Sequence, residues 1–303
     1  MRVLLTGAGG FVGQHVVSTL LAAGHEVHAI GRSRPPQSGI GFTAVDLLDP
    51  AARREAVNQT AASGLIHLAW VAEPGVYWHA PANLDWAAAS VDLLRLFQDA
   101  GGTRAVMVGS CAEYAWGGPL LSEATTPCTP ATLYGAAKDS TRRLAMAYAR
   151  QTGLSLAWAR LFFLYGPGER PGRLVSDAVT ALRAGHAFPT SEGCQRRDYL
   201  HVGDAARALV ALLDSAAEGP VNIGSGDAVS LRNLLEELAG QLGARPLLRF
   251  GARPRAVNDP PVIAADVTRL AAEVGFRPQF NLASGLADTI AAAAGQASPG
   301  SAR

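Results

Sequence analysis

The sequence predicts an α/β fold: a doubly wound parallel sheet followed by a smaller mixed α/β domain. Three observations predict it. Short apolar runs alternate with amphipathic stretches over the first 160 residues, glycines close the amphipathic stretches, and the later pattern is more mixed. Strands separated by helices of this length are typical of parallel sheets, because a parallel pair needs a long crossover connection. We expect residues 1–165 to form the first domain, together with some later segments, and residues 166–292 to form most of the second.

The expected elements follow from the hydrophobic periodicity. Strand-like runs cover residues 3–6, 26–30, 42–45, 65–69, 105–109 and 155–160, and helical patterns cover 14–23, 84–100, 132–150, 174–184, 204–215 and 231–240. Glycine follows the first two helices, at Gly24 and Gly101, where it is a usual stop signal. The small and polar residues at the end of the chain predict a disordered tail over 293–303.

The composition excludes several classes of protein. The 303 residues are 49% hydrophobic, which is enough for a full core. The net charge is +1, from 26 basic and 25 acidic residues, so neither nucleic acid nor an anionic membrane is an expected partner. We expect no membrane-spanning helix and no secretory signal. Three cysteines without metal-ligand spacing predict a reduced, cytoplasmic protein with neither disulfides nor a metal site.

A glycine-rich turn directly follows the first strand, and its sequence is Thr-Gly-Ala-Gly-Gly-Phe-Val-Gly over 6–13. Such a turn, placed between a strand and a helix, lets backbone N–H groups and the helix N-terminus approach a pyrophosphate closely. The sequence therefore predicts dinucleotide binding, and the alternative is a turn that is only structural. The residues expected to contact the dinucleotide here are Gly7, Gly10, Phe11, Val12 and Gly13.

The end of the second strand predicts which dinucleotide binds. An acidic residue there binds the adenosine ribose of NAD(H), but the chain reads Ile-Gly-Arg-Ser-Arg over 30–34. Arg32 and Ser33 suit a 2′-phosphate, so we expect NADP(H), with NAD(H) as the alternative cofactor. The alternative role of Arg32 is that of a solvated loop arginine. Asp46, after the third strand, is expected either to accept from the adenine amino group or to cap the next helix.

Further cofactor contacts are expected at Leu47 and at the end of the fourth strand, because the carboxyl edge of the sheet faces the cofactor. At that strand end the chain reads Leu68-Ala69-Trp70. His67, inside the strand, is expected to be a packed core residue rather than a catalyst. The aromatic-rich segment 70–78 is expected either to shape a substrate pocket or to pack against the following helix.

Tyr134 and Lys138 stand four residues apart at the start of a predicted helix, so they share one helix face. A phenol with a pKa near ~10 is a poor acid at neutral pH, but an ammonium and an oxidised nicotinamide both lower that pKa. The phenol can then exchange a proton with a carbonyl or alcohol while hydride moves. Lys138 is the only lysine, which indicates either chance or a need for a compact ammonium. The Ser110 hydroxyl, at the end of the fifth strand, is expected to hold the reacting oxygen.

Six motifs occur in a fixed order along residues 1–292. They are Gly7/Gly10/Gly13, Ser110 with Tyr114, Tyr134/Lys138, Tyr165-Gly166-Pro167, Arg197-Asp198-Tyr199-Leu200-His201-Val202 and Asn222-Ile223-Gly224-Ser225-Gly226. Together they resemble the extended short-chain dehydrogenase/reductase superfamily, and within it the NAD-dependent epimerase/dehydratase branch that acts on nucleotide sugars. The resemblance implies a Rossmann domain, a smaller domain that holds a nucleoside-diphosphate sugar, and a homodimer.

The resemblance also implies roles for individual residues. Tyr134 is then the acid/base, Lys138 binds the nicotinamide ribose and tunes Tyr134, Ser110 binds the reacting oxygen, and Arg197 contacts the substrate diphosphate. The alternative for Arg197 is an ion pair with Asp198 or Asp204. Other positions expected on the substrate side are Cys111, Ala112, Phe163, Arg173 and Arg255.

Departures from the family narrow the expected reaction. Family dehydratases carry an Asp-Glu pair after the catalytic serine or threonine, where this chain has Cys111 and Ala112. We therefore expect no dehydration, and Cys111 is expected to be buried packing rather than a nucleophile. Phe163 stands where the family has asparagine, and Arg255 stands near the site of a displaced arginine.

Three functions follow from these observations. The first is NADPH-dependent reduction of a nucleoside-diphosphate 4-keto-(6-deoxy) sugar to the alcohol. The second is 4-epimerisation of a nucleotide sugar with retained NAD. The third, from another class, is a non-catalytic regulator that senses the cofactor, although such a protein does not need an intact Ser110, Tyr134 and Lys138.

Overall fold

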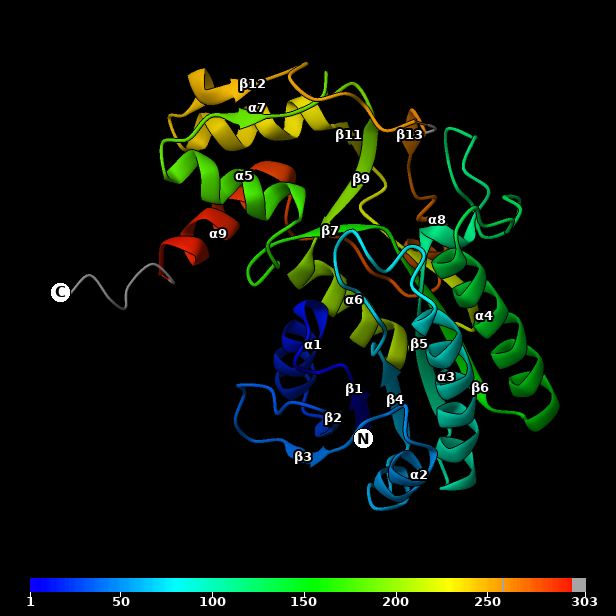
Figure 1. Ribbon diagram of the computed structural model, residues 1–303. Helices are drawn as coiled ribbons and strands as arrows, with labels where there is room; N and C mark the ends of the chain where they lie inside the picture. Colours follow the sequence, from blue (N-terminus) through cyan, green and yellow to red (C-terminus); the bar gives the residue numbers. More distant parts are fainter. Residues whose placement is uncertain (258, 296–303) are drawn as a thin grey trace.

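The main sheet has seven parallel strands, in the order β10-β6-β5-β4-β1-β2-β3 (Figure 1). The computed structural model describes residues 1–257 and 259–295. The strand order reverses beside β1, which is where open parallel sheets bind ligands at their carboxyl edge. The strands are β1 (Arg2–Thr6), β2 (Glu26–Gly31), β3 (Gly41–Ala44), β4 (Gly64–His67), β5 (Arg104–Ser110), β6 (Ser155–Leu161) and β10 (Gly219–Ile223).

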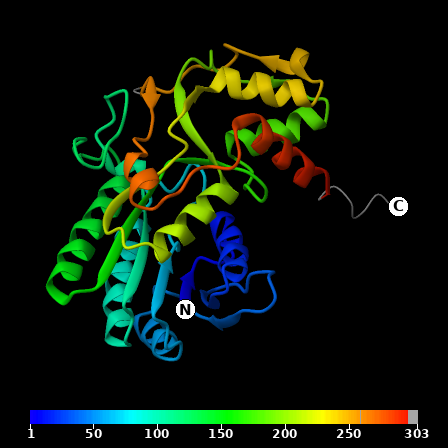
Figure 2. The same cartoon turned by 180° about the vertical axis from the view of Figure 1, so that it is seen from behind.

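Helices cover both faces of this sheet, which confirms the doubly wound arrangement (Figures 1 and 2). Alternation along β1 shows how: Val3 and Leu5 belong to the core under α1 and α6, whereas Leu4 belongs to the core under α2, α3 and α4. Both cores are closed by aliphatic residues from the helices. The helices are α1 (Phe11–Ala22), α2 (Pro50–Asn58), α3 (Ala82–Asp99), α4 (Leu133–Thr152) and α6 (Val202–Asp214).

A smaller mixed layer lies above the carboxyl edge of the main sheet (Figure 1). Strand β9 pairs with β7, β11 and β13, β8 pairs with β12, and a third core joins α5, α7 and α9. The strands are β7 (Phe163–Tyr165), β8 (Phe188–Pro189), β9 (Arg196–His201), β11 (Ala228–Ser230), β12 (Leu248–Arg249) and β13 (Val262–Ile263). The helices are α5 (Leu174–Arg183), α7 (Leu231–Gln241), α8 (Thr268–Ala272) and α9 (Leu282–Gly295), with short 3₁₀ turns η1 (Cys111–Glu113) and η2 (Arg245–Leu247).

The predicted elements are present, with differences at their ends. All six predicted strands form. Strand β4 ends at His67, two residues earlier than predicted, because Leu68 and Ala69 lie against the glycine turn at Gly7. Residues 293–295 are helical in α9, where the sequence predicted a disordered tail, because the alanine-rich run continues the helix. Residues 296–303 lie outside the described residues. Within residues 1–257 and 259–295, no helix is both long and apolar enough to cross a membrane.

Candidate active site

The glycine turn is packed so closely that it leaves room for backbone atoms only. Gly7 has a φ of +72°, and a Cβ there would lie 2.9 Å from the Ala69 amide nitrogen. A Cβ on Gly13 would lie 2.0 Å from the Gly7 carbonyl oxygen. The first N–H groups of α1, from Phe11 and Val12, follow directly, and helix starts leave such groups without helical partners. This cradle fits the pyrophosphate of a dinucleotide.

The loop after β2 lies beside this turn. A Cβ on Gly9 would stand 3.5 Å from the Ser33 carbonyl oxygen, so Ser33 is adjacent to the cradle. Arg32 is exposed, whereas the neighbouring Arg34 lies over the Phe42 ring at 5.3 Å. Arg32 therefore keeps its guanidinium at the surface, beside the cradle.

Asp46 does not cap the next helix, so that alternative was wrong. Asp49 is the N-cap of α2, and its Oδ1 accepts the N–H groups of Ala51 and Ala52. Asp46 Oδ1 accepts only from Leu48 N, which forms a local turn and leaves Asp46 exposed. The neighbouring Leu47 is buried against the second core.

The end of β4 is tied to the end of β1. The Thr6 hydroxyl accepts the N–H groups of Leu68 and Ala69, each at 3.2 Å. His67 lies between Thr6 at 2.7 Å and the Ser90 hydroxyl at 2.8 Å, and burial lowers its pKa to about 3. His67 is therefore a neutral core residue, as the sequence predicted.

Tyr134 and Ser110 come together at the carboxyl edge. Thr132 caps α4, with its hydroxyl accepting from Gly135 N, and this places Tyr134 in the first turn. Burial raises the pKa of Tyr134 above its ordinary value, and a hydrogen bond with Ser110 acts in the opposite direction. The net direction is opposite to the predicted one, because desolvation of the phenolate outweighs the favourable contacts.

Lys138 is buried one turn further along α4, at 4% exposure. Its Nζ donates to the Val108 carbonyl oxygen at 2.8 Å and lies 3.6 Å from the centre of the Trp70 ring. Burial lowers the pKa of Lys138 to about 7. The only lysine is thus a buried amine one helical turn from Tyr134, held against β5 and the Trp70 ring.

The segment 70–78 packs against the following helix, as one of the two predicted alternatives had it, and it also contacts Tyr134. Trp70 packs toward Trp86 of α3, with ring centres 6.5 Å apart. Tyr77 and Trp78 instead place their rings edge-on to Tyr134, at 4.9 and 5.7 Å. The density of aromatic residues indicated this segment from the sequence, but not which of its rings form this aromatic wall against Tyr134.

One buried amide fixes this aromatic segment. Asn83 is fully buried, and its Nδ2 donates to the carbonyl oxygens of Tyr77 and Ala80. Its Oδ1 accepts the Trp70 indole N–H at 2.8 Å. The Tyr134 amide also donates to the Trp78 carbonyl oxygen at 3.1 Å, so the wall and α4 are held as one unit.

Two of the three arginines expected on the substrate side, Arg197 and Arg255, pair with the carboxylate of Asp259. Arg197, from β9, is buried and pairs with Asp259, and it also donates to the Pro260 carbonyl oxygen. Arg255 pairs with the same Asp259 at 3.4 Å. The predicted alternative, an ion pair of Arg197 with Asp198 or Asp204, was wrong. Asp198 instead accepts backbone N–H groups of the loop after β10.

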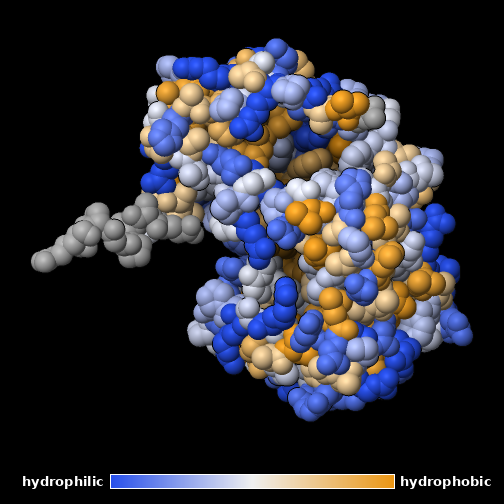
Figure 3. All heavy atoms as spheres, viewed as in Figure 1, coloured by the Kyte–Doolittle hydropathy of each residue, from blue (hydrophilic) through white to orange (hydrophobic). Residues whose placement is uncertain are grey.

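The remaining candidates are Cys111, Ala112, Phe163 and Arg173. Cys111 and Ala112 are buried in η1, and burial raises the pKa of the Cys111 thiol to about 12, so Cys111 is not a nucleophile. Phe163 lies 5.7 Å from the Arg197 guanidinium, and Arg173, at the start of α5, lies 5.3 Å from the Tyr77 ring. The face drawn in Figure 3 is hollowed between the smaller layer and the main sheet.

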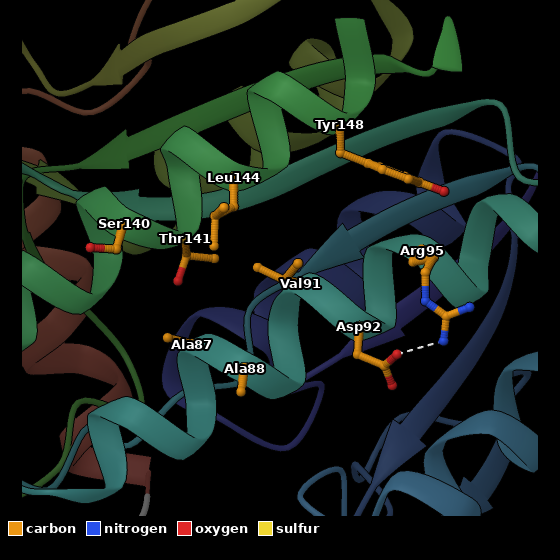
Figure 4. A pocket seen from close by; sticks show the side chains of 9 residues that line it. All are labelled: Ala87, Ala88, Val91, Asp92, Arg95, Ser140, Thr141, Leu144 and Tyr148. Atoms are coloured by element: carbon orange, nitrogen blue, oxygen red, sulfur yellow. Dashed lines mark hydrogen bonds and ion pairs between the residues drawn. The ribbon is translucent and has the colours of Figure 1, made fainter. Parts of the chain in front are cut away.

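A separate groove lies on the outer face of the molecule, between α3 and α4 (Figure 4). The side chains of Val91 and Leu144 face each other across it, and Leu144 is 59% exposed. Asp92 and Arg95 form an ion pair of 2.7 Å at its edge. The groove contains none of the predicted site residues, and its apolar lining indicates a contact surface rather than a reaction site.

Comparisons with known proteins agree with this geometry. A family model described as the NAD dependent epimerase/dehydratase family matches residues 3–224. The UDP-glucose 4-epimerase of Corynebacterium glutamicum is 27% identical, over 92% of this chain and 91% of that protein. The dTDP-6-deoxy-L-talose 4-dehydrogenase (NAD(+)) of Aggregatibacter actinomycetemcomitans is 28% identical, over 86% and 97%. The structure of MoeE5 with UDP-glucose and NAD is 30% identical, covers 98% of this chain and 100% of that chain, and gives a TM-score of 0.85.

Proposed function

Because the chain belongs to the NAD dependent epimerase/dehydratase family, we propose that it reduces a nucleoside-diphosphate 4-keto-(6-deoxy) sugar to the alcohol, with NADPH as reductant. One observation carries this proposal. Tyr134 contacts Ser110 at the carboxyl edge, with Lys138 one helical turn along α4, and the one carboxylate of η1, Glu113, is turned back to the Ser110 backbone N–H. Such a set suits hydride chemistry at a carbonyl and little else.

The dinucleotide would rest on the turn Gly7 to Gly13, with its nicotinamide ribose at Lys138. When bound, the reduced nicotinamide supplies a hydride to the carbonyl carbon. Tyr134 gives its phenolic proton to the carbonyl oxygen, which becomes the alcohol, and Ser110 holds that oxygen in line. Lys138, at 4% exposure, favours the phenolate left after proton transfer, because its charge is poorly screened by solvent.

NADPH is preferred over NADH in this proposal because of the loop after β2. The loop offers Arg32 and Ser33 to a 2′-phosphate, and it has no acid for a ribose diol. MoeE5 and the Aggregatibacter dehydrogenase carry NAD in their descriptions. The preference for NADPH is therefore a specific departure of this chain that binding measurements can test.

The substrate side supports a nucleoside diphosphate. Arg197 and Arg255 both pair with Asp259, so two guanidinium groups stand together, and guanidinium pairs are suited to the oxygens of a diphosphate. The aromatic rings of Tyr77 and Trp78 beside Tyr134 suit the apolar face of a deoxy sugar. Cys111 and Ala112 provide no acid/base pair for loss of water.

A second candidate is 4-epimerisation with retained NAD, which the similarity to the Corynebacterium UDP-glucose 4-epimerase favours. It uses the same Ser110, Tyr134 and Lys138 in both directions. The two functions differ in the fate of the cofactor, because a reductase releases it after each turnover.

We also propose that the protein forms a homodimer through the groove between α3 and α4, where Leu144 and Val91 expose apolar surface. A cytoplasmic location is proposed from the cysteines, because Cys111, Cys128 and Cys194 are all free thiols.

The test is the cofactor that accompanies the purified protein, followed by NADPH and NADH oxidation with nucleoside-diphosphate 4-keto sugars. Protein that purifies without dinucleotide and oxidises NADPH faster than NADH supports the reductase. Bound NAD⁺ that survives purification, with interconversion of UDP-glucose and UDP-galactose, supports the epimerase instead. Dinucleotide binding without either activity would leave the regulator of the sequence analysis.

A further inference from the structure

A buried carboxylate lies directly behind the end of β5. Glu113, the last residue of η1, is fully buried. Its Oε1 accepts the backbone N–H of Ser110 at 2.8 Å, and its two oxygens accept the Trp158 indole N–H at 2.9 and 3.1 Å. The Ser110 hydroxyl accepts in turn from Ala112 N, which completes a capping box around η1. The geometry of Ser110 therefore depends on Glu113.

Arg160 balances this carboxylate from β6. Its Nε donates to Glu113 Oε2 at 2.7 Å, its Nη1 to the Tyr114 hydroxyl at 2.8 Å, and its Nη2 to Cys128 Sγ at 3.0 Å. Tyr114 donates onward to Asn222 on β10 at 2.8 Å. A buried ion pair whose remaining groups are hydrogen-bonded holds its members in one geometry.

The backbone before Ser110 is shaped to admit the carboxylate. A Cβ on Gly109 would lie 2.2 Å from Glu113 Oε1 and 2.1 Å from Trp158 Nε1. Side-chain carbons do not approach other atoms so closely, and the position therefore requires glycine. The absence of a side chain at Gly109 therefore lets the Glu113 carboxylate contact the end of β5, next to Ser110.

The same carboxylate acts on the ammonium of Lys138. Lys138 Nζ donates to the Val108 carbonyl oxygen and Glu113 Oε1 accepts the Ser110 N–H, so the two groups hold backbone atoms two residues apart on β5. Burial lowers the pKa of Lys138, and the negative charge of Glu113 opposes that change. The other groups packed around the ammonium carry no charge near neutral pH: His67 on β4, the Val108 carbonyl on β5 and the Trp70 ring. Two arginines face Glu113 itself: Arg160 Nε from β6 and Arg142 Nε from α4 lie 2.7 and 3.8 Å from Glu113 Oε2. Asp139, the residue after Lys138 on α4, pairs with Arg142 and Arg143.

We propose that Glu113 is a positioning residue of the active site: it fixes Ser110 through the end of β5, and its negative charge favours the ammonium form of Lys138. The assignment of Ser110 and Lys138 to catalysis rests on the proposed function. The effect of Glu113 on the charge of Lys138 does not depend on the proposed function, because it is a property of the folded protein without cofactor or substrate. It can therefore fail or succeed on its own.

The single lysine makes a direct measurement available. Protein labelled with ¹³C at the lysine ε-carbon gives one side-chain resonance, from Lys138, whose chemical shift reports the protonation of its amine. The unaltered protein should titrate near the pKa of about 7 that burial sets. In Glu113→Gln, which keeps the size and the acceptor but loses the charge, the midpoint should fall by about one pH unit or more. Glu113→Asp keeps the charge and should restore most of the difference.

Asp204→Asn is the matched control. Asp204 is also fully buried, pairs with Arg207, and accepts the N–H groups of Gln279 and Phe280, but it belongs to α6 and not to the site. This variant should lose thermal stability and leave the Lys138 midpoint unchanged. An unchanged midpoint in Glu113→Gln, or an equal shift in Asp204→Asn, would overturn the proposal.

If Glu113→Gln does not fold because Arg160 is left unpaired, the double variant Glu113→Gln/Arg160→Met removes both charges. Its reference is Arg160→Met, which lacks the same positive charge: the Lys138 midpoint must be lower in the double variant than in Arg160→Met, and an equal midpoint refutes the proposal. In turnover, Glu113→Gln should lower kcat with little change in KM for the nucleotide sugar, and its loss of activity at alkaline pH should begin at lower pH. A raised KM with an unchanged kcat and pH profile would show a merely structural role.

Discussion

Replacement of Gly13 by alanine tests the dinucleotide cradle. A Cβ at this position would lie 2.0 Å from the Gly7 carbonyl oxygen, roughly 1.4 Å closer than the 3.4 Å at which ordinary contact begins. Its next neighbour, Ala8 Cα at 2.7 Å, is also a backbone atom, so no side-chain rotation relieves the overlap. The start of α1 must move away from the turn. Overpacking of this kind costs about 1–3 kcal/mol, which corresponds to a decrease in Tm of about 2–12 °C at about 2–4 °C per kcal/mol.

The same movement carries the N–H groups of α1 away from a bound pyrophosphate. The unaltered protein should melt higher with dinucleotide, since a ligand at 100 times its Kd adds about 2.7 kcal/mol of stability, and Gly13→Ala should lose most of that gain. Differential scanning fluorimetry with and without NADPH measures both effects. Gly9→Ala is the control, because its Cβ would lie 3.5 Å from the Ser33 oxygen, an ordinary contact. A full NADPH-induced shift in Gly13→Ala would refute the cradle.

Four further predictions concern the chemistry, the cofactor, the pH dependence and the assembly. Tyr134→Phe should lower kcat by about 10²-fold or more while NADPH binding persists, and turnover close to that of the unaltered protein would exclude Tyr134 as the acid. Arg32→Asp should move the ratio of kcat/KM for NADPH and NADH toward NADH, whereas an unchanged ratio would show that Arg32 does not read the 2′-phosphate. His67, with a pKa lowered to about 3, stays neutral in the folded protein but is protonated in the unfolded chain below about pH 6.5; stability in urea should therefore fall between pH 6.5 and 3, and less so in His67→Asn. Leu144→Glu should produce a monomer by sedimentation, and a dimer that persists would place the interface elsewhere.

The fold was predictable because its signals are local. Each of the six strands of the first domain is a short apolar run, and the helices between them carry an apolar stripe or end at glycine. Asp49 caps α2 with Pro50 after it, a start signal that is visible in the sequence. Asp46 was the less suitable candidate, because three residues separate it from that proline. Strand β10 is different: its place beside β6 depends on the chain returning from the second layer, which no local pattern encodes.

The site was predictable where spacing determines geometry, and not where distant segments meet. Four residues on a helix bring Tyr134 and Lys138 to one face, so sequence was sufficient for that pair. Asp259 lies 62 residues from Arg197, and their pairing arises only when β13 and β9 align. On an extended segment after Ser110, Glu113 would face away from Ala112. It lies instead in the turn η1, where the capping box with Ser110 bends the chain and buries the carboxylate.

Lys138 shows why one lysine persists in a chain that otherwise uses arginine. Where the chain buries arginine, it surrounds the guanidinium with acceptors: Arg104 donates to three carbonyl oxygens at the end of α6 and to the Ser155 hydroxyl. At 138 the described residues offer one acceptor, the Val108 carbonyl, and the face of Trp70. A guanidinium has five donors, most of which would lose water here without gaining a partner, and it cannot give up its proton. An ammonium fits the space and can titrate, so this position couples the charge of the site to pH.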